Sequence, residues 1–149
     1  MKIRMVERKD FKDWLKLRKS LWPEYSLDEL ETEMHQFYDQ IEKTPTFIAE
    51  DPEKDICGFI EVSIRNTAPG CRTKNVGYIE GWYVKPEYRK MGIGKRLVKT
   101  AEKWAISKGC REMASDTNER YPVSTVAHKS LGYERVTNDI RFRKTISSY

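Results

Sequence analysis

Cysteine and long apolar runs are the scarce features of this 149-residue sequence. Its three cysteines are odd in number and fit neither a C-x-x-C motif nor zinc spacing, so we expect reduced, mostly structural thiols and no metal site. No stretch approaches the roughly 20 apolar residues that cross a bilayer, which argues against a membrane-spanning helix. The first residues lack the apolar core of a signal peptide, and we therefore expect a cytoplasmic protein without a membrane partner.

Two phosphate-binding sequences are also missing, namely G-x-x-x-x-G-K-[ST] and G-x-G-x-x-G, which argues against a Walker loop and a dinucleotide-binding fingerprint. Only two histidines are present, and they lie far from the cysteines in the sequence. A catalytic cysteine is not excluded by count, but no family signature surrounds any of the three.

A hydrophobic content of 38% and a charged content of 34% predict a single globular domain over residues 1–149. The net charge of +5 is uneven, because acids crowd residues 24–53 and bases crowd one face of a later helix. A basic zone suits the phosphates of a cofactor, and an acidic zone suits a cationic substrate. Two ordinary solvated helix faces would carry the same charges.

The N-terminal half predicts strands over residues 2–6, 46–50 and 56–65 and two helices between the first two strands. Asp10 is placed to cap the first helix, which Pro23 should stop. Ser26 and Glu29 form a capping-box pattern for the second helix, whose apolar stripe extends to Ile41. Residues 66–75 are predicted to be a loop.

Residues 78–84 are rich in aromatic and β-branched side chains, which predicts a strand that ends before Pro86. From Met91 the period is helical, and Gly109 is placed to end that helix. Further strands are predicted over 111–115, 133–136 and 140–144, with a helix over 123–131 that Gly132 ends. The order β-α-α-β-β-β-α-β-α-β-β indicates an α/β fold with a mixed central sheet flanked by helices.

Between the strand and the helix lies R-x-x-G-x-G, from Arg89 to Gly94. Glycines at the start of a helix let a ligand approach the backbone, and the free N–H groups of the first turn attract an anion such as a diphosphate. The glycines alone would equally fit a simple turn. The ordered set of strand, proline, arginine, two glycines and amphipathic helix is more specific than the glycines.

The run E-G-W-Y-V-K-P-E-Y-R-K-M-G-I-G-K-R-L-V resembles the acetyl-CoA-binding motif of the GNAT superfamily of N-acetyltransferases. This resemblance implies a GNAT-like fold in which a strand pair splays to hold the pantetheine arm and the loop wraps the pyrophosphate of coenzyme A. The positions that it assigns to acetyl-CoA binding are Trp82, Tyr83, Val84, Arg89, Lys90, Met91, Gly92, Ile93, Gly94 and Lys95. Among these, the backbone N–H groups of Trp82 to Val84 would serve as oxyanion and pantetheine donors.

Three shorter blocks are similar to the aminoglycoside 6′-N-acetyltransferases: L-W-P from Leu21, S-I-R from Ser63 and C-R-E-M-A-S-D-T from Cys110 to Thr117. This resemblance implies direct acetyl transfer from acetyl-CoA to the 6′-amine of aminoglycosides, hence antibiotic resistance, and a homodimer. It assigns Glu80 to the substrate ammonium groups and to proton transfer through water. It also places Asp116 and Trp22 in substrate binding, although Asp116 would fit a turn and Trp22 a core position.

His128 stands where many superfamily members carry a tyrosine that protonates the leaving thiolate. An imidazole could do the same, but a thiol pKa of about 8.5 means that the thiolate needs little help at neutral pH. His128 is therefore a candidate catalytic acid, and the identity of the acid stays open. A lone helical histidine is also commonly an ordinary surface or partly buried residue.

Two alternative functions are kept. A related enzyme could acetylate another amine, such as a polyamine, a protein N-terminus or a lysine, with the same cofactor residues and a different cleft. The excess of Lys and Arg could instead indicate a nucleic-acid-binding module, but no recognised motif of that class is present and we expect no nucleic-acid partner.

Overall fold

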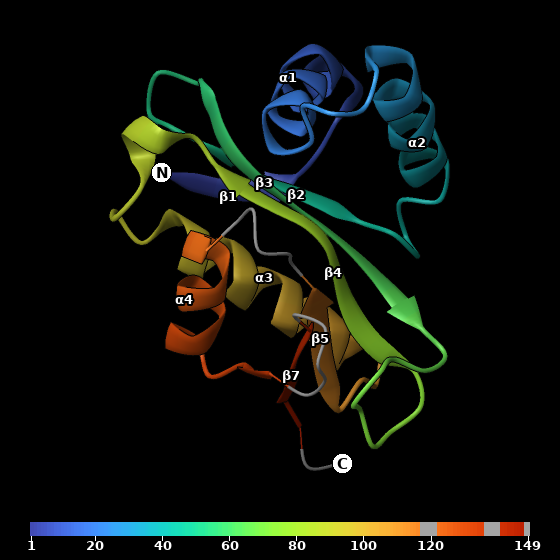
Figure 1. The fold of residues 1–149 in the computed structure, drawn as a ribbon. Helices are drawn as coiled ribbons and strands as arrows, with labels where there is room; N and C mark the ends of the chain where they lie inside the picture. The colour runs from blue at the N-terminus through green and yellow to red at the C-terminus, as the bar shows by residue number, and fades with distance from the viewer. Residues whose placement is uncertain (117–121, 136–140, 148–149) are drawn as a thin grey trace. The chain divides into compact units, whose positions relative to one another are not determined.

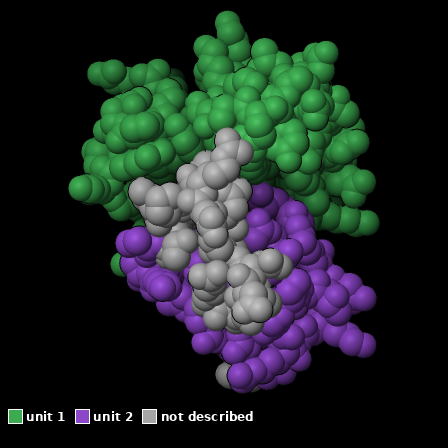
Figure 2. Space-filling view, in the orientation of Figure 1, with its two compact units in different colours: residues 1–62, 81–100 green, residues 63–80, 101–149 purple. Residues whose placement is uncertain are grey.

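The computed structural model describes residues 1–116, 122–135 and 141–147 of the chain (Figure 1). The chain divides into two compact units, which Figure 2 distinguishes by colour. Unit 1 comprises residues 1–62 and 81–100, and unit 2 comprises residues 63–80 and 101–149. Three elements contribute residues to both units: β3 (Ile56–Arg65), β4 (Val76–Val84) and α3 (Ile93–Ser107).

In unit 1, β1 (Lys2–Met5) pairs antiparallel with β2 (Thr46–Glu50), which pairs antiparallel with β3. Two helices, α1 (Phe11–Leu21) and α2 (Leu27–Asp39), lie next to each other beside these strands (Figure 1). Apolar side chains from both helices and from the strands form one core, with Val6, Trp14, Leu17, Met34, Ile48, Ile56 and Phe59 as its buried members. Burial of these side chains supplies the driving force that holds the helices on the strands.

Local signals set the ends of these helices as the sequence predicted. The first helix ends at Leu21, before Pro23. The Ser26 hydroxyl accepts a hydrogen bond from the Glu29 N–H at 3.1 Å and donates to the Glu29 carboxylate at 3.0 Å, which confirms the predicted cap. The second helix ends at Asp39, two residues earlier than its apolar stripe suggested.

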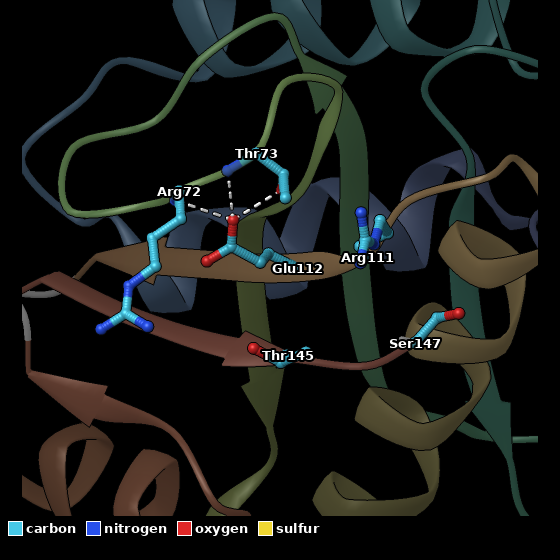
Figure 3. A pocket seen from close by; sticks show the side chains of 6 residues that line it. All are labelled: Arg72, Thr73, Arg111, Glu112, Thr145 and Ser147. Atoms are coloured by element: carbon cyan, nitrogen blue, oxygen red, sulfur yellow. Dashed lines mark hydrogen bonds between the residues drawn. The ribbon is translucent and has the colours of Figure 1, made fainter. Parts of the chain in front are cut away.

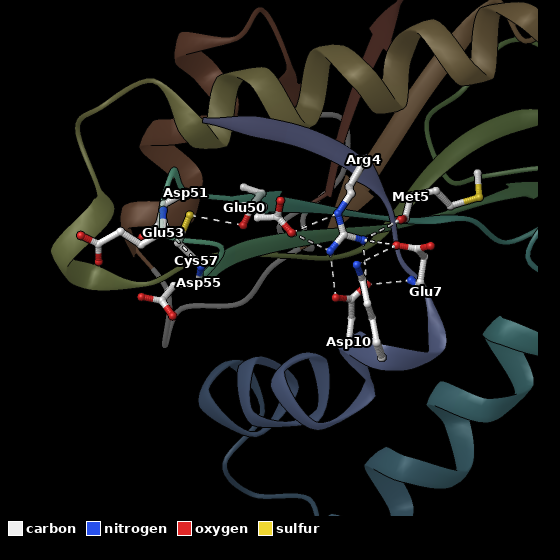
Figure 4. Close-up of polar contacts among 11 residues, drawn as sticks. Arg4, Met5, Glu7, Asp10, Glu50, Asp51, Glu53, Asp55 and Cys57 are labelled. Atoms are coloured by element: carbon white, nitrogen blue, oxygen red, sulfur yellow. Dashed lines mark hydrogen bonds and ion pairs between the residues drawn. The ribbon is translucent and has the colours of Figure 1, made fainter.

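Asp10 occupies the N-cap position of the first helix, as predicted, but its side chain does not make the expected cap bond. Asp10 belongs to a short 3-10 helix, η1 (Arg8–Asp10), and makes no side-chain cap bond to α1. Its two carboxylate oxygens accept from Arg4 at 2.8 and 2.9 Å, and Arg4 also binds Glu50 (Figure 4). Burial raises the pKa of Asp10, but the Arg4 guanidinium and the Glu7 N–H outweigh it and hold that pKa below its usual value.

In unit 2, β4 pairs parallel with β5 (Glu112–Asp116), and β5 pairs antiparallel with β7 (Arg141–Thr145), beside which β6 (Glu134–Arg135) lies antiparallel. The full strand order is β1-β2-β3-β4-β5-β7-β6. The helix α4 (Pro122–Ser130) is followed by Gly132, whose φ of 88° is the left-handed conformation expected after a helix end. The predicted mixed α/β sheet is confirmed.

Several boundaries differ from the prediction by a few residues. β4 starts at Val76 rather than at residue 78, and a 3-10 helix, η2 (Pro86–Tyr88), was not predicted. α3 starts at Ile93 rather than at Met91, and Gly109 after its end has a φ of 88°, as its predicted role requires. Three residues named above lie outside the described residues. They are Thr117, at the end of the C-R-E-M-A-S-D-T block, and Val136 and Ile140, at the ends of two predicted strands.

Glu112 anchors the loop between β3 and β4 in unit 2. Its Oε1 accepts hydrogen bonds from the N–H groups of Arg72 and Thr73 and from the Thr73 hydroxyl, at 2.6 to 2.8 Å (Figure 3). These residues border an open pocket of about 310 Å³, together with Arg111, Thr145 and Ser147. None of the site residues predicted from the sequence lines this pocket, so we assign Glu112 a structural role.

Candidate active site

The turn from β4 into α3 contains two residues with a left-handed backbone. Lys90 and Gly92 both have positive φ, at 64° and 80°. A side chain at Gly92 would meet no atom within 4 Å, so the left-handed backbone, and not crowding, requires glycine there. Lys90 has the same left-handed backbone although it carries a Cβ atom. Residues other than glycine rarely adopt this conformation because it is strained.

Two side chains fix this loop within unit 1. Arg89 donates from Nε to the Val84 carbonyl at 2.9 Å, and its guanidinium carbon lies 5.4 Å from the centre of the Tyr83 ring. The Tyr88 hydroxyl donates to Asp51 at 2.7 Å. This bond raises the pKa of Tyr88 to about 12 and lowers the pKa of Asp51. The loop is therefore held by one contact to the end of β4 and by another to Asp51, which follows β2.

The start of α3 offers donors and positive charge to a phosphate group. Lys90, Lys95 and Arg96 are exposed there, and the Arg96 N–H already bonds to the Gly92 carbonyl at 3.1 Å, which marks the first helical turn. A methyl group on Gly94 would lie 3.2 Å from the Trp82 ring, so the helix start packs closely on the end of β4. This arrangement fits the diphosphate of a coenzyme.

In unit 2, Glu80 lies in a polar cluster on one face of β3, β4 and β5. Arg65 Nη2 donates to both Glu80 carboxylate oxygens, at 2.7 and 2.8 Å, and the Ser63 hydroxyl donates at 3.3 Å. Because side chains alternate along a strand, Ser63 and Arg65 share one face of β3, and Tyr78 and Glu80 share one face of β4. The Glu80 carboxylate is partly exposed and already paired with a cation.

Tyr78 links this cluster to Asp116. The Arg65 guanidinium carbon lies 3.5 Å from the centre of the Tyr78 ring, and the Tyr78 hydroxyl donates to Asp116 at the end of β5. Arg141 Nη1 approaches the same hydroxyl at 3.5 Å. Burial, followed by the Asp116 carboxylate, raises the pKa of Tyr78, so its hydroxyl keeps its proton and stays a donor near neutral pH.

His128 is buried in unit 2 and is held by aromatic rings. It stacks on Phe142 with centroids 4.4 Å apart and an interplanar angle of 8°, and Tyr133 meets it edge-on at 5.8 Å. Its Nε2 lies 2.8 Å from the Ser115 hydroxyl, one residue before Asp116. Packing and hydrogen bonding therefore fix the ring, a geometry that suits a structural role as readily as an acid.

Trp22 in unit 1 is half-buried at the end of α1. A methyl group on Gly81 would lie only 2.5 Å from its Cη2 atom, so the ring covers the backbone of β4. The Arg18 guanidinium lies 4.9 Å from the Trp22 ring centre and binds the buried Glu61, to which Trp14 also donates at 2.9 Å. Burial raises the pKa of Glu61, and the neighbouring Arg18 guanidinium lowers it by less than burial raises it.

A family model described as the acetyltransferase (GNAT) family matches residues 14–133, which is most of the chain. The chain belongs to this acetyltransferase family. The GNAT fold expected from the sequence is thereby confirmed.

Relatives similar to this acetyltransferase over nearly their whole length act on aminoglycosides. It is 40% identical over 146 residues to aminoglycoside N(6′)-acetyltransferase type 1 of Klebsiella aerogenes, covering 97% of this chain and 96% of that protein. The Salmonella typhimurium protein of the same name is 36% identical over 145 residues, covering 97% and 99%.

Two solved structures extend this likeness to the fold. The aminoglycoside antibiotic 6′-N-acetyltransferase of Acinetobacter haemolyticus has a TM-score of 0.87 and 33% identity, over 99% of this chain and 100% of its own. The aminoglycoside N-acetyltransferase AAC(6′)-Iy was solved with the bisubstrate analogue CoA-S-monomethyl-acetylneamine. Its TM-score is 0.85, with 34% identity over 93% of this chain and 94% of its own.

The cysteines of this acetyltransferase are free thiols, and their environment fits the expected structural role. Cys57 and Cys110 are buried and Cys71 is half-buried. Burial raises the pKa of all three thiols, to about 11 for Cys71, which disfavours the nucleophilic thiolate at neutral pH. Within the described ranges, no cluster of metal-ligating side chains occurs, and every helix is too short or too polar to traverse a lipid bilayer.

The structure places the predicted residues of this acetyltransferase in two groups. Unit 1 holds Trp22 and the ten positions assigned to the coenzyme, while unit 2 holds Glu80, Asp116 and His128. Arg65 and Tyr78 were not predicted from the sequence to belong to the polar cluster around Glu80. The signal was their alternation with Ser63 and Glu80 on neighbouring strands, but alternation does not tell which residues face each other across a sheet.

Proposed function

We propose that this acetyltransferase transfers the acetyl group of acetyl-CoA directly to the 6′-amine of aminoglycoside antibiotics and so confers resistance to them. The observation that chiefly supports this proposal is the similarity to aminoglycoside N(6′)-acetyltransferases over nearly the whole length of the chain. The carboxylates of Glu80 and Asp116, joined through Arg65 and Tyr78, support this substrate class. Partly exposed carboxylates suit the ammonium groups of an aminoglycoside, which carries several.

The proposed coenzyme site comprises the end of β4, the loop and the first turn of α3, from Trp82 to Lys95. Acetyl-CoA supplies the acetyl group as a thioester. The positive-φ loop, the exposed bases and the helix start fit its diphosphate, and Trp82 to Val84 extend the site along the strand. Because β4 carries both these residues and Glu80, one strand connects the coenzyme segment to the acid.

The proposed chemistry needs no protein nucleophile. The neutral 6′-amine forms the C–N bond with the thioester carbonyl carbon, the C–S bond breaks, and the sulfur leaves as a thiolate. Glu80 accepts the proton that the amine nitrogen loses, directly or through a water molecule, and Asp116 holds another ammonium group. His128 is the candidate acid, but the thiolate leaves with little help at neutral pH, so the proposal does not depend on it.

The first test measures coenzyme A thiol release with acetyl-CoA and either kanamycin or tobramycin. Wild-type protein should turn over both. Glu80→Gln should lower kcat/KM for the aminoglycoside by about 100-fold or more, as loss of a general base does, and Asp116→Asn should lower it by about 10- to 150-fold, as loss of a contact with a charged group does. Asp13→Asn removes the same charge from an exposed position on α1 and should leave kcat/KM unchanged. An aminoglycoside with a hydroxyl in place of the 6′-amine should not be acetylated at that position.

Competition separates this proposal from acetylation of another amine. Polyamines, a peptide N-terminus and a lysine peptide are compared with tobramycin by kcat/KM, because that ratio measures discrimination. A higher value for any of them would replace the aminoglycoside as substrate. Absence of turnover with every amine, despite coenzyme A binding, would leave the amine unidentified and overturn the proposed substrate.

The proposal extends to the organisation of the protein. We propose one domain over residues 1–149, because β3, β4 and α3 run through both units and the family match spans them. A cytoplasmic location is supported by the free cysteines, since oxidising compartments favour disulfides. A homodimer, proposed from the resemblance to the aminoglycoside enzymes, is tested by light scattering after size-exclusion chromatography. Nucleic acid is not among the proposed partners.

A further inference from the structure

One nitrogen of Arg65 occupies both oxygens of the Glu80 carboxylate. Nη2 lies 2.7 Å from Oε1 and 2.8 Å from Oε2, so a single guanidinium nitrogen bridges the two carboxylate oxygens. An amine substrate that binds Glu80 as an ammonium group needs the same oxygens. A second cation on this carboxylate would lie within a few ångströms of the first and repel it.

The Arg65 side chain is placed where it can leave. It is 41% exposed, against 19% for Glu80, so the cation is the solvent-side partner of the pair. Ion pairs that are open to water contribute little to stability because both charges are well solvated when apart. Separation of Arg65 from Glu80 therefore costs little when another cation takes its place, whereas leaving Glu80 unpaired beside Tyr78 would cost more.

We infer that Arg65 is an internal counter-ion that a substrate ammonium group displaces from Glu80. Arg65 thereby acts on substrate selection as well as on the fold: a substrate must offer a cation that replaces a guanidinium. A substrate with several ammonium groups displaces Arg65 more effectively than a substrate with one. Its second ammonium group binds Asp116, and this contact offsets the loss of the Arg65–Glu80 ion pair. This inference rests on the proposed function.

The test is Arg65→Met, which keeps an unbranched apolar stem over Tyr78 and removes the charge. If the counter-ion must be displaced, KM for tobramycin should fall about 5-fold, and KM should rise more steeply with added NaCl, since the site has gained net negative charge. KM for acetyl-CoA should stay at its wild-type value. Isothermal titration with tobramycin should show the same fall in Kd.

Two further variants keep the result interpretable. Arg72→Met removes an arginine from an exposed position of the same unit and should leave both KM values unchanged, which controls for net charge. Arg65→Lys keeps the charge and should retain the wild-type KM for tobramycin and its salt dependence. If Arg65→Met unfolds, as a melting curve would show, Arg65→Gln replaces it at this partly exposed position.

The outcomes separate the inference from the proposed function. Wild-type turnover of tobramycin with an unchanged or raised KM in Arg65→Met would overturn the counter-ion role, and a raised KM would instead make Arg65 a residue that positions Glu80. Absence of wild-type turnover would overturn the proposed function itself. A lowered KM in both Arg65→Met and Arg72→Met would reduce the effect to net charge and equally overturn the inference.

Discussion

The hydroxyl of Tyr78 donates a hydrogen bond to the Asp116 carboxylate, and this bond joins the first part of β4 to the end of β5. The parallel register Tyr78↔Ala114 makes the contact, because Asp116 lies two residues further on the same face of β5. The bond orients the Asp116 carboxylate. Because Asp116 is exposed and a carboxylate accepts several hydrogen bonds, it can accept a further bond from a substrate donor.

Tyr78→Phe removes only the hydroxyl and should weaken aminoglycoside binding. A hydrogen bond to a charged group contributes about 1.5 kcal/mol at the low end, so KM for tobramycin should rise about 10-fold. KM for acetyl-CoA should not change. Tyr38→Phe on α2 is the matched control, and steady-state kinetics with each substrate varied in turn would check both. An unchanged KM for tobramycin would show that Asp116 does not need this orientation.

Gly81→Ala should displace Trp22. The new methyl group would lie 2.5 Å from the Trp22 ring, closer than real side chains approach, and 3.3 Å from Glu61, which is a tight contact. Overpacking of this kind costs about 1–3 kcal/mol of unfolding free energy. In a Trp22→Phe background the same change should cost less, because the smaller ring leaves room. Urea denaturation of the four proteins measures this coupling, and additive costs would show that the ring does not bear the strain.

Arg18→Met should strongly destabilise the protein. Glu61 is 1% exposed and would lose its cation, which costs about 3–5 kcal/mol for a buried pair. Arg18→Met combined with Glu61→Leu should recover most of that loss, because the uncompensated charge is gone. Glu33→Gln removes only the exposed partner of Arg18 and should cost less than about 1 kcal/mol. Equal losses in the single and double variants would contradict this account.

Signals that act within one element were read correctly from the sequence. The Ser26 and Glu29 cap depends on residues three apart, and the apolar face of α3 depends on a period of 3.6. The left-handed Gly109 and Gly132 follow from helix ends alone. The turn between β4 and α3 was predicted for the same reason, since its strand, glycines and helix are contiguous.

Contacts between distant segments were not accessible to that reasoning. Asp10 stands where a helix cap should stand, yet Arg4 on β1 takes both of its oxygens, and a guanidinium that also binds Glu50 is a stronger partner than a backbone N–H. The Arg65 and Glu80 pair depends on which residues of β3 and β4 stand opposite each other. A shift of one residue would turn either side chain to the other face, and no local pattern fixes that register.

His128→Leu tests whether the buried imidazole is an acid or a packing residue. Loss of the Phe142 stack and the Ser115 contact should cost about 1–3 kcal/mol and lower the melting temperature. The maximal rate should change by less than about 3-fold, because a thiolate of pKa about 8.5 leaves without general acid. A fall in kcat of about 100-fold with an unchanged melting temperature would instead assign the acid to His128.

The Arg4 and Asp10 pair should make stability depend on acid pH. The folded pKa of Asp10 lies below its unfolded value, so its contribution is fully present above the unfolded pKa of about 3.9 and is lost as pH falls through the folded pKa. Asp10→Asn should therefore lower the melting temperature at pH 7. The gap to wild type should close as the pH falls below about 4, where the wild-type carboxyl takes up its proton.

Differential scanning fluorimetry from pH 7 down to about 3 would follow this gap, since the window spans the usual aspartate pKa. Asp13→Asn, at an exposed position on the neighbouring helix, is the control and should track wild type throughout. A gap that stays constant with pH would mean that the Asp10→Asn protein loses stability through altered hydrogen-bond geometry and not through lost charge. A closing gap shows that Asp10 stabilises unit 1 through its charge, which is paired with Arg4 and accepts from the Glu7 N–H, because protonation removes that charge.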